Sequence, residues 1–531
     1  MIQMNRIFSD NMVLQRGEPV AVFGKAAPQS RVKVAVPERN IEVVVAASKD
    51  GEFFAKLPSQ DAGASVTLIV SELESGSTKQ FFNVRYGEVW MAAGQSNMEF
   101  ELQNAKQGVS ELMSLKEMRE QGEEQGVYYY FAEKMGYESE EAKKREEAAC
   151  WHSVVEEDAR RLSAVGYFAA KELARQLSVP VGIINCNHGG TSISCWMDKS
   201  YLNSFADGAW YVKQYEELVK DKTNEEYLEE MEEYKKTLQE YQELTKRLLE
   251  EASERGESLS GEQLNELAGP YPWPEPQGWL SPYRPGGLYE TMLTKLTPYT
   301  MKGVWFYQGE EDGPRSPRYE AMLTHLIAEW REIFQKELPF VIMQLPMFLE
   351  KGLEEQGYFT GIRRAQEMVS QKVSNVTLVP LCDLGEYDNI HPIDKKTPGL
   401  RLGRMTYSTI YDEKEEVRPM KYAGYFMEAG TLTVYFDEMA GGFMINEAKQ
   451  GEEPNLITVD EAREKEVAIS GFEIAGTDGI FYPADAVVER SFVILSSRDV
   501  PSPMAVQYGQ KDFICCNLYN KQGIPLIPFG M

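Results

Sequence analysis

The sequence predicts an α/β fold in which a parallel sheet covered by helices is flanked by a β-sandwich at each end of the chain. Three observations predict it. Short β-type runs fill residues 1–85 and the region after about residue 413, and apolar runs alternate with helical patterns between them. A charged helical insertion interrupts that alternation at about residues 201–275. Because 531 residues are too many for one hydrophobic core, we expect three domains: 1–85, 86–412 and 413–531.

The two terminal regions share one pattern of short apolar runs separated by turn residues. Gly, Pro and Asp punctuate the runs Val20–Phe23, Val32–Val36 and Val66–Val70 near the start of the chain. The runs Leu432–Phe436 and Phe492–Leu495 repeat the pattern near the end. Regular spacing of this kind predicts a small β-sandwich. The N-terminal region contains no cluster of titratable residues that predicts a site.

The central region alternates strands and helices. Val89–Ala93, Val181–Asn185 and Gly303–Gln308 are short apolar runs of the kind found in buried strands. Ser163–Leu177 and Tyr319–Phe334 carry apolar residues at helical spacing. Strands that alternate with helices indicate a parallel sheet, whose active-site residues gather at the carboxyl ends of the strands.

The insertion contains a heptad-like apolar stripe. Tyr227, Met231, Tyr234, Leu238 and Tyr241 follow alternating steps of four and three residues, which predicts a long helix with a narrow seam. The simplest interpretation is a helical hairpin that lies against its own core. A contact in a homodimer and a functional lid are the alternatives. The four prolines between residues 270 and 276 end the helix.

Composition excludes several classes of partner and site. A net charge of −28 argues against nucleic acid and anionic membranes as partners. No stretch approaches the roughly 20 apolar residues of a spanning helix, and the first residues lack a signal-peptide pattern, so we expect a cytoplasmic protein. Six sparse cysteines and four scattered histidines predict free thiols and no metal site.

A serine and a histidine predict acyl-transfer chemistry. Ser96 follows the strand Val89–Ala93 on a turn that begins at Gly94, where a hydroxyl can act as a nucleophile. A histidine is the expected base. Of His152, His188, His325 and His391, only the last has an aspartate, Asp388, three residues before it; a short loop can bring such a pair together. His188 is the alternative that lies in a glycine-rich block.

Several blocks of sequence resemble the sialate O-acetylesterase family of SGNH (GDSL-like) hydrolases. They are, in order, EVWMAAGQSNM (88–98), VGIINCNHGGTSISCWMD (181–198), KGVWFYQGEEDG (302–313), AEWREIFQKELPFVIMQLPMF (328–348) and DNIHPIDKKTPGLRLG (388–403). The resemblance implies a flavodoxin-like core in which Ser96, Asp388 and His391 form a catalytic triad. Many relatives place the acid where this chain has Asn389, so Glu386 and Asp383 are alternative acids.

An acyl-transfer site also needs donors for the oxyanion. The backbone N–H of Ser96 is one, and the turn Gly189–Gly190 supplies the second, for which we favour Gly190 because glycine lets the backbone approach a ligand. The resemblance implies that Gln308 replaces the usual SGNH asparagine as the third donor. Glu310 and Glu99 are expected to support the site as acceptors. Arg363 matches a family arginine that either touches substrate or braces the fold.

The resemblance implies a serine esterase that removes O-acetyl groups from carbohydrates through an acetyl-enzyme, without a cofactor. The expected substrate is an O-acetylated mono- or oligosaccharide, with 9-O-acetylated sialic acid first and neutral plant oligosaccharides such as xylan, xyloglucan or mannan fragments second. A non-catalytic carbohydrate-binding or scaffold protein is the alternative from another class. The intact set of Ser96, Asp388, His391 and Gln308 argues against it.

Overall fold

A computed structural model describes residues 2–155, 157–255, 261–353, 355–411, 417–437 and 441–530. The chain forms two compact units. One contains residues 1–134, 140–193 and 292–531, and the other contains 135–139 and 194–291. The expected domain boundary at residues 412 and 413 lies outside the described residues.

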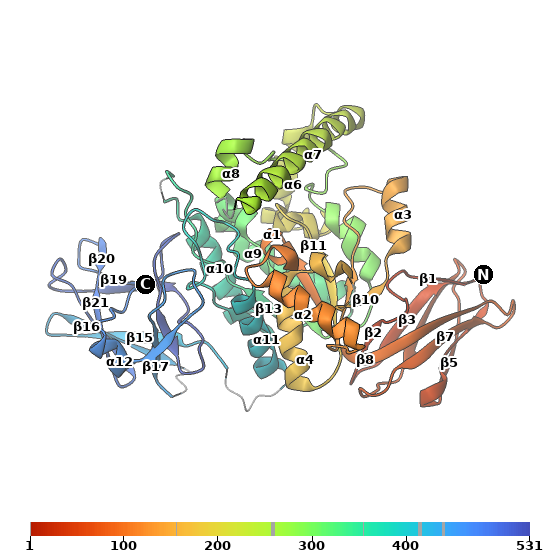
Figure 1. The fold of residues 1–531 in the computed structure, drawn as a ribbon, viewed down its shortest axis with the longest axis horizontal. Helices are drawn as coiled ribbons and strands as arrows, with labels where there is room; N and C mark the ends of the chain where they lie inside the picture. Colours follow the sequence, from red (N-terminus) through yellow and green to blue (C-terminus); the bar gives the residue numbers. More distant parts are fainter. Residues whose placement is uncertain are drawn as a thin grey trace. The chain divides into compact units, whose positions relative to one another are not determined.

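The N-terminal region of the larger unit consists of strands (Figure 1). Strands β1, β3 and β6 form a three-stranded sheet. Strand β4 pairs antiparallel with β5 and β7, and β7 pairs antiparallel with β8. Their bounds are β1 Gln3–Met4, β2 Val13–Gln15, β3 Val20–Lys25, β4 Arg31–Val36, β5 Ile41–Ala46, β6 Glu52–Leu57 and β7 Val66–Glu72. In β7 buried and half-buried residues alternate strictly, as in a strand with one face on the core.

Strand β8 (Thr78–Gly94) links this region to the central sheet. Its first part pairs antiparallel with β7, and its last part pairs parallel with two strands of the core. The first part is largely exposed, whereas the last nine residues are all buried, as is usual in a parallel strand covered on both faces. The strand therefore runs without a break through the expected boundary between residues 85 and 86.

The central sheet has the strand order β10-β9-β11-β8-β12-β13-β14. All neighbours in it are parallel except β10 and β9. Numbered along the chain, β11-β8-β12-β13-β14 has the order 2-1-3-4-5 of flavodoxin-like sheets, and β9 and β10 extend one edge. The bounds are β9 Val127–Phe131, β10 Trp151–Ser153, β11 Val181–Asn187, β12 Gly303–Tyr307, β13 Phe340–Met343 and β14 Val376–Val379.

Helices α4 and α11 pack closely on one another. Helix α4 begins after Ser163, whose hydroxyl oxygen accepts the N–H of Gly166 as an N-cap. On α11, side chains at Gly399 and Gly403 would meet the carbonyl oxygens of Val165 and Ala169 at 2.8 and 2.7 Å, so both glycines permit the close approach. The α-helices of this unit before its C-terminal region are α1 Ser96–Glu99, α2 Gly108–Gln121, α3 Glu140–Ala148, α4 Ala164–Leu177, α9 Ser316–Ile333, α10 Tyr358–Lys372 and α11 Lys396–Ile410.

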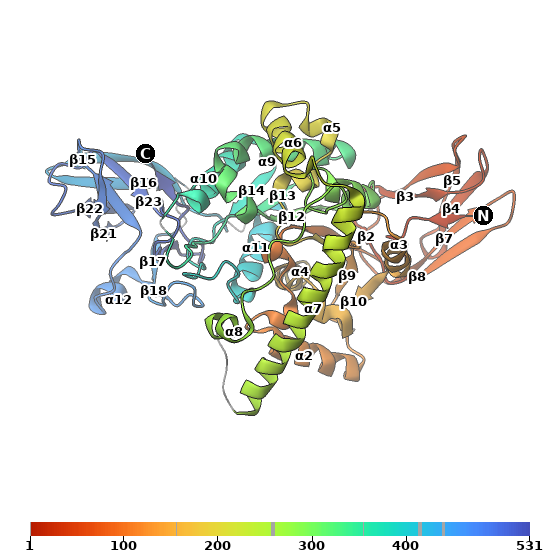
Figure 2. The same ribbon diagram turned by 90° about the horizontal axis from the view of Figure 1, so that it is seen from above.

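The smaller unit is helical and is built around α7, a continuous helix of 31 residues (Figure 2). Its helices are α5 Lys199–Leu202, α6 Ala206–Val219, α7 Asn224–Glu254 and α8 Gly261–Ala268. The apolar stripe of α7 is covered from within the unit. Tyr227 packs against Gly278, the hydroxyl of Tyr234 donates to the Pro272 carbonyl at 2.9 Å, and the rings of Tyr241 and Tyr271 lie 5.6 Å apart. The stripe thus packs on the proline-rich segment that returns along the helix.

The C-terminal region of the larger unit forms three small sheets, ordered β15-β16-β22-β21, β18-β17-β24 and β20-β19-β23-β25. Their shared apolar core includes Met347 and Cys382, which come from the central region. The bounds are β15 Lys421–Glu428, β16 Thr431–Asp437, β17 Phe443–Asn446, β18 Leu456–Thr458, α12 Val459–Glu464, β19 Phe472–Ala475, β20 Phe481–Pro483, β21 Asp485–Glu489, β22 Phe492–Ser496, β23 Ala505–Tyr508, β24 Leu518–Asn520 and β25 Phe529–Gly530.

Candidate active site

Ser96 lies on a sharp turn at the carboxyl end of β8. Gly94 ends the strand with a φ of 135°, and a Cβ at this position would collide with the carbonyl oxygen of Tyr307 in β12. Only glycine fits this combination of conformation and close approach. Gln95 follows as the N-cap of α1, and Ser96 is the first residue of that helix. The hydroxyl therefore stands at the edge where parallel α/β sheets bind their ligands.

The side chain of Gln95 ties the serine turn to the loop that follows β12. It is 2% exposed, and its Oε1 accepts the backbone N–H groups of Gly309 at 3.2 Å and Glu311 at 3.3 Å. The two loops come from neighbouring strands, β8 and β12. Sequence reasoning did not single out Gln95, although its place beside Ser96 in the GQSN block was a usable signal.

The structure brings His391 to Ser96. Nε2 of the imidazole lies 2.8 Å from the Ser96 Oγ. Burial, and to a smaller extent the positive charge of Lys395, lower the pKa of His391 to about 4, although Glu99 opposes the shift. A neutral imidazole at this distance can take the proton of the serine hydroxyl.

The structure does not bring Asp388 to His391. The exposed Asp388 carboxylate accepts the N–H of Lys351 at 2.6 Å, and its residue adopts the left-handed conformation, with a φ of 60°. Among the residues that the structure describes, Ser96 is the one hydrogen-bond partner of the His391 ring. The Asp-x-x-His spacing does not produce the expected pair because the loop turns at residue 388 and sends the two side chains to different partners.

The two alternative acids are also engaged elsewhere. Glu386 accepts the side-chain amide of Asn389 at 2.7 Å. Asp383 is 1% exposed and forms a two-point ion pair with Arg401, at 2.8 and 2.7 Å, and a further hydrogen bond with Tyr519. Asp383 therefore links the core to the C-terminal sheets rather than to the histidine.

The glycine turn after β11 lies against the serine. A Cβ at Gly189 would come within 3.4 Å of the Ser96 Cβ, and the N–H of Gly189 donates to Glu99. Within the described part of the chain, the backbone N–H groups of Ser96 and Gly190 have no recorded acceptor. These two donors are therefore free for an oxyanion, whereas the N–H of Gly189 is occupied by a carboxylate.

Gln308 follows β12, at the expected strand end, but its side-chain amide is hydrogen-bonded within the protein. Its fully buried Nε2 donates to the Asp312 Oδ2 at 2.6 Å and lies 3.2 Å from both the Thr191 carbonyl and the Gln95 Oε1. An amide has two N–H donors, and these three acceptors use both. The side chain holds loops together because its polar atoms are already paired within the protein.

Behind the serine lies a buried polar cluster of Asn97, Glu310 and Lys395. The side chain of Asn97 donates to Glu310 and accepts from Lys395, both at 2.6 Å. Burial raises the pKa of Glu310 and lowers that of Lys395 to about 7. Glu310 was expected to support the site. Asn97 and Lys395 were missed, and their positions next to Ser96 and four residues after His391 are the signal that was available.

Arg363 braces the fold. It is 1% exposed, and its guanidinium donates to the Pro346 carbonyl at 3.2 Å, to the Thr360 Oγ1 at 3.0 Å and to the Lys511 carbonyl. Asp512 accepts the N–H of Thr360 at 2.9 Å beside it. The arginine thus joins the start of α10 to the C-terminal sheets, which favours the second of the two roles expected for it.

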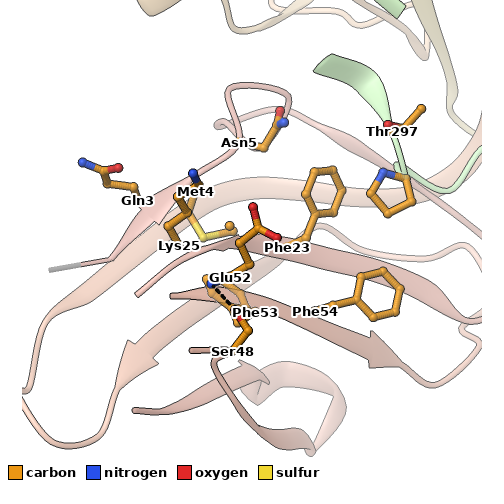
Figure 3. A pocket seen from close by; sticks show the side chains of 12 residues that line it. Gln3, Met4, Asn5, Phe23, Lys25, Ser48, Glu52, Phe53, Phe54 and Thr297 are labelled. Atoms are coloured by element: carbon orange, nitrogen blue, oxygen red, sulfur yellow. Dashed lines mark hydrogen bonds between the residues drawn. The ribbon is translucent and has the colours of Figure 1, made fainter. Parts of the chain in front are cut away.

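Other candidate features lie away from these residues. A pocket of about 650 Å³ on the N-terminal strands is lined by residues that include Phe23, Phe53 and Phe54 (Figure 3), and none of the predicted site residues borders it. The described residues contain no cluster of three or more His, Cys, Asp or Glu that suits a metal ion. No helix in the described ranges is both long and apolar enough to cross a membrane.

Comparisons with known proteins show the family of the chain. The family model described as "Carbohydrate esterase, sialic acid-specific acetylesterase" matches residues 86–248 and 276–410, more than half of the chain. It leaves out 249–275, a shorter segment than the insertion expected at 201–275. Sialate O-acetylesterase of Mus musculus is 23% identical over 449 residues, covering 77% of this chain and 73% of that protein. The Homo sapiens enzyme is 23% identical over 437 residues, covering 76% and 70%.

A solved structure shares the fold. The carbohydrate acetylesterase from Xanthomonas citri superposes with a TM-score of 0.72 at 23% identity, covering 100% of this chain and 99% of that one. The family match confirms the family to which the sequence blocks pointed. The chain belongs to the carbohydrate esterases of the sialic acid-specific acetylesterase family and is a carboxylic ester hydrolase.

Proposed function

We propose that the protein is a serine esterase that hydrolyses O-acetyl groups on carbohydrates, with Ser96 as nucleophile and His391 as base. The observation that carries the proposal is the 2.8 Å separation of the Ser96 Oγ from the His391 Nε2, at the carboxyl edge of the sheet. The low pKa of His391, about 4, supports it because the imidazole is then neutral near pH 7 and can accept a proton.

The reaction has two halves. In the first, Nε2 of His391 takes the hydroxyl proton while the Ser96 Oγ attacks the acetyl carbonyl. The oxyanion lies between the N–H groups of Ser96 and Gly190, and the sugar oxygen leaves with the proton from His391. In the second half, water loses a proton to His391 and attacks the acetyl-enzyme, which releases acetate and restores Ser96.

The catalytic unit we propose is the pair of Ser96 and His391. A third member that orients the imidazole was expected in Asp388, but its carboxylate binds the Lys351 N–H. Gln308 contributes by holding the Thr191 carbonyl and Asp312 around the glycine turn, since its amide is paired with both.

The substrate we propose is an O-acetylated sialic acid, because the curated relatives are sialate O-acetylesterases. Neutral acetylated oligosaccharides are the second candidate. The net charge of −28 favours them, since an acidic protein does not attract an anionic sugar over long range.

The test compares wild type with Ser96→Ala and His391→Ala. We expect hydrolysis of p-nitrophenyl acetate by wild type and a loss of at least about 10³-fold in kcat for both variants, because the two residues act as a unit. Acetate release from 9-O-acetyl-N-acetylneuraminic acid and from acetylated xylo- and manno-oligosaccharides then ranks the substrates. A folded Ser96→Ala protein with wild-type turnover would contradict the proposal, and melting temperatures provide the folding control.

A further inference from the structure

One buried carboxamide joins three of the loops that build the candidate site. Asn97 is fully buried; its Nδ2 donates to the Glu310 Oε1 at 2.6 Å and to the Ile390 carbonyl at 2.9 Å, and its Oδ1 accepts from the Lys395 Nζ at 2.6 Å. The partners fix which end of the amide is oxygen, because a lysine can only donate and a carbonyl can only accept. The nucleophile turn, the loop after β12 and the histidine loop are therefore tied at one point.

This tie sets the position of the base. The His391 ring is hydrogen-bonded to Ser96. The position of the ring also depends on the backbone of the loop that carries His391. Asn97 holds the carbonyl of Ile390, directly before the histidine, and the Asn389 Oδ1 accepts the His391 N–H at 3.1 Å. Asn97 sits beside Ser96 in the chain, so the same residue positions nucleophile and base relative to each other.

The cluster also contains a buried cation whose charge acts on the imidazole. Lys395 is 2% exposed, and its Nζ lies 4.7 Å from the centre of the Phe100 ring. The carboxylates whose charges act on it are Glu310, Glu386 and Asp394. The charges that act on the His391 ring are Lys395 and, with the opposite sign, Glu99. Glu310 reaches Lys395 through the Asn97 amide, which is bonded to both.

We propose that Asn97, Glu310 and Lys395 form a positioning unit that docks the histidine loop against the nucleophile turn and presents a positive charge to the imidazole. This inference rests on the proposed roles of Ser96 and His391. A carboxylate beside the ring, as in a triad, favours the imidazolium. A cation disfavours it, so His391 stays neutral and able to accept a proton in mildly acidic solution.

The decisive measurement is the titration of His391 itself. With only four histidines in the chain, ¹³C-labelled imidazole signals can be assigned by single substitutions and followed by NMR between pH 3.5 and 8. In Lys395→Met we expect the His391 midpoint to rise by about 0.5–1 pH unit, because an opposing charge is removed. The acid limb of kcat/KM for p-nitrophenyl acetate should move by the same amount.

Lys396→Met is the matched control, since it removes the same charge one residue along the chain from a side chain that does not act on His391. It should leave the midpoint unchanged. Asn97→Ala should lower kcat by about 10²-fold or more with KM within about threefold, because misplaced catalytic groups lose rate before binding. If Lys395→Met does not fold, the double variant Glu310→Gln/Lys395→Met removes both charges and keeps an acceptor for Asn97; the same rise is expected in it.

Two results would overturn the inference: an unchanged His391 midpoint in folded Lys395→Met or in the double variant, or wild-type kcat in folded Asn97→Ala. The titration needs no turnover, so it separates this inference from the proposed function. If wild type does not hydrolyse the ester or Ser96→Ala retains activity, the proposed function fails, while the midpoints still decide whether Lys395 acts on the imidazole.

Discussion

The acid limb of the pH–rate profile distinguishes a serine–histidine pair from a triad. In the structure the His391 ring is buried near the Lys395 cation, and its pKa falls from 6.5 to about 4. A carboxylate placed on the ring would act in the opposite direction, by about 1–3 pH units. The experiment varies the pH and measures kcat/KM, which reports the ionisation of groups in the free enzyme.

The expected effect is large. At pH 5 an imidazole with an ordinary pKa is only about 3% neutral, whereas one with a pKa of about 4 is about 90% neutral. The ratio of kcat/KM at pH 5 to that at pH 7 should therefore be about 0.9 for this site, against about 0.04 for an unperturbed histidine. Below pH 4 the rate should fall tenfold per pH unit.

The assay measures initial rates of p-nitrophenyl acetate hydrolysis at constant ionic strength, at a wavelength where nitrophenol and nitrophenolate absorb equally. Circular dichroism at each pH shows that the protein remains folded, and the rate with Ser96→Ala is subtracted as background. A midpoint at or above pH 6 would refute the reasoning. It would mean that a carboxylate faces the imidazole in the working enzyme, with Asp388 as the first candidate.

Three further predictions follow from single contacts. Asp388→Asn should change kcat by less than about threefold, because the carboxylate binds the Lys351 N–H and not His391; a loss above 10²-fold in steady-state kinetics would restore the triad. Gly94→Ala should lower the free energy of unfolding in urea by about 2–4 kcal/mol, because a Cβ would collide with the Tyr307 carbonyl. Gly122→Ala is the control: with a φ of 72° and open space around it, it should lower the same free energy by about 1 kcal/mol. Asp383→Asn should remove about 3–5 kcal/mol by breaking the buried pair with Arg401, whereas Asp460→Asn, in an exposed pair with Arg463, should have no measurable effect on the melting temperature.

The sequence predicted those parts of the fold that repeat a simple pattern. The expected helix Ser163–Leu177 corresponds to α4, and the apolar runs Val89–Ala93 and Val181–Asn185 lie in β8 and β11. Periodicity identifies such elements because burial imposes it residue by residue. Ser96 was identified for a similar reason, since a glycine that breaks a buried strand marks a turn at the sheet edge. The domain boundary expected at residue 85 lies inside β8, and this continuity was missed. The strand keeps its extended conformation there, and only its pairing partner changes, from β7 to β12.

Loop side chains were harder to predict because their partners come from distant parts of the chain. The spacing of Asp388 and His391 permits a contact, but the Asp388 carboxylate accepts the N–H of Lys351 instead. Gln308 stands at the expected strand end, and only the structure shows that Asp312, four residues later, already accepts from its amide. No local pattern predicts that the Lys395 Nζ donates to the Asn97 Oδ1, because 298 residues separate them in the chain.

Three buried side-chain amides, those of Gln95, Asn97 and Gln308, form hydrogen bonds between the loops of this site. An amide can donate and accept at once, so it links loops without adding a charge that burial would penalise. Lys395, which is hydrogen-bonded to Asn97, supplies the charge that acts on the base, while the amide of Asn97 holds the carbonyl directly before the base. Geometry and proton affinity of His391 thus depend on different atoms, so a neutral substitution at Asn97 and a charge substitution at Lys395 should have separable effects on rate and on pH dependence.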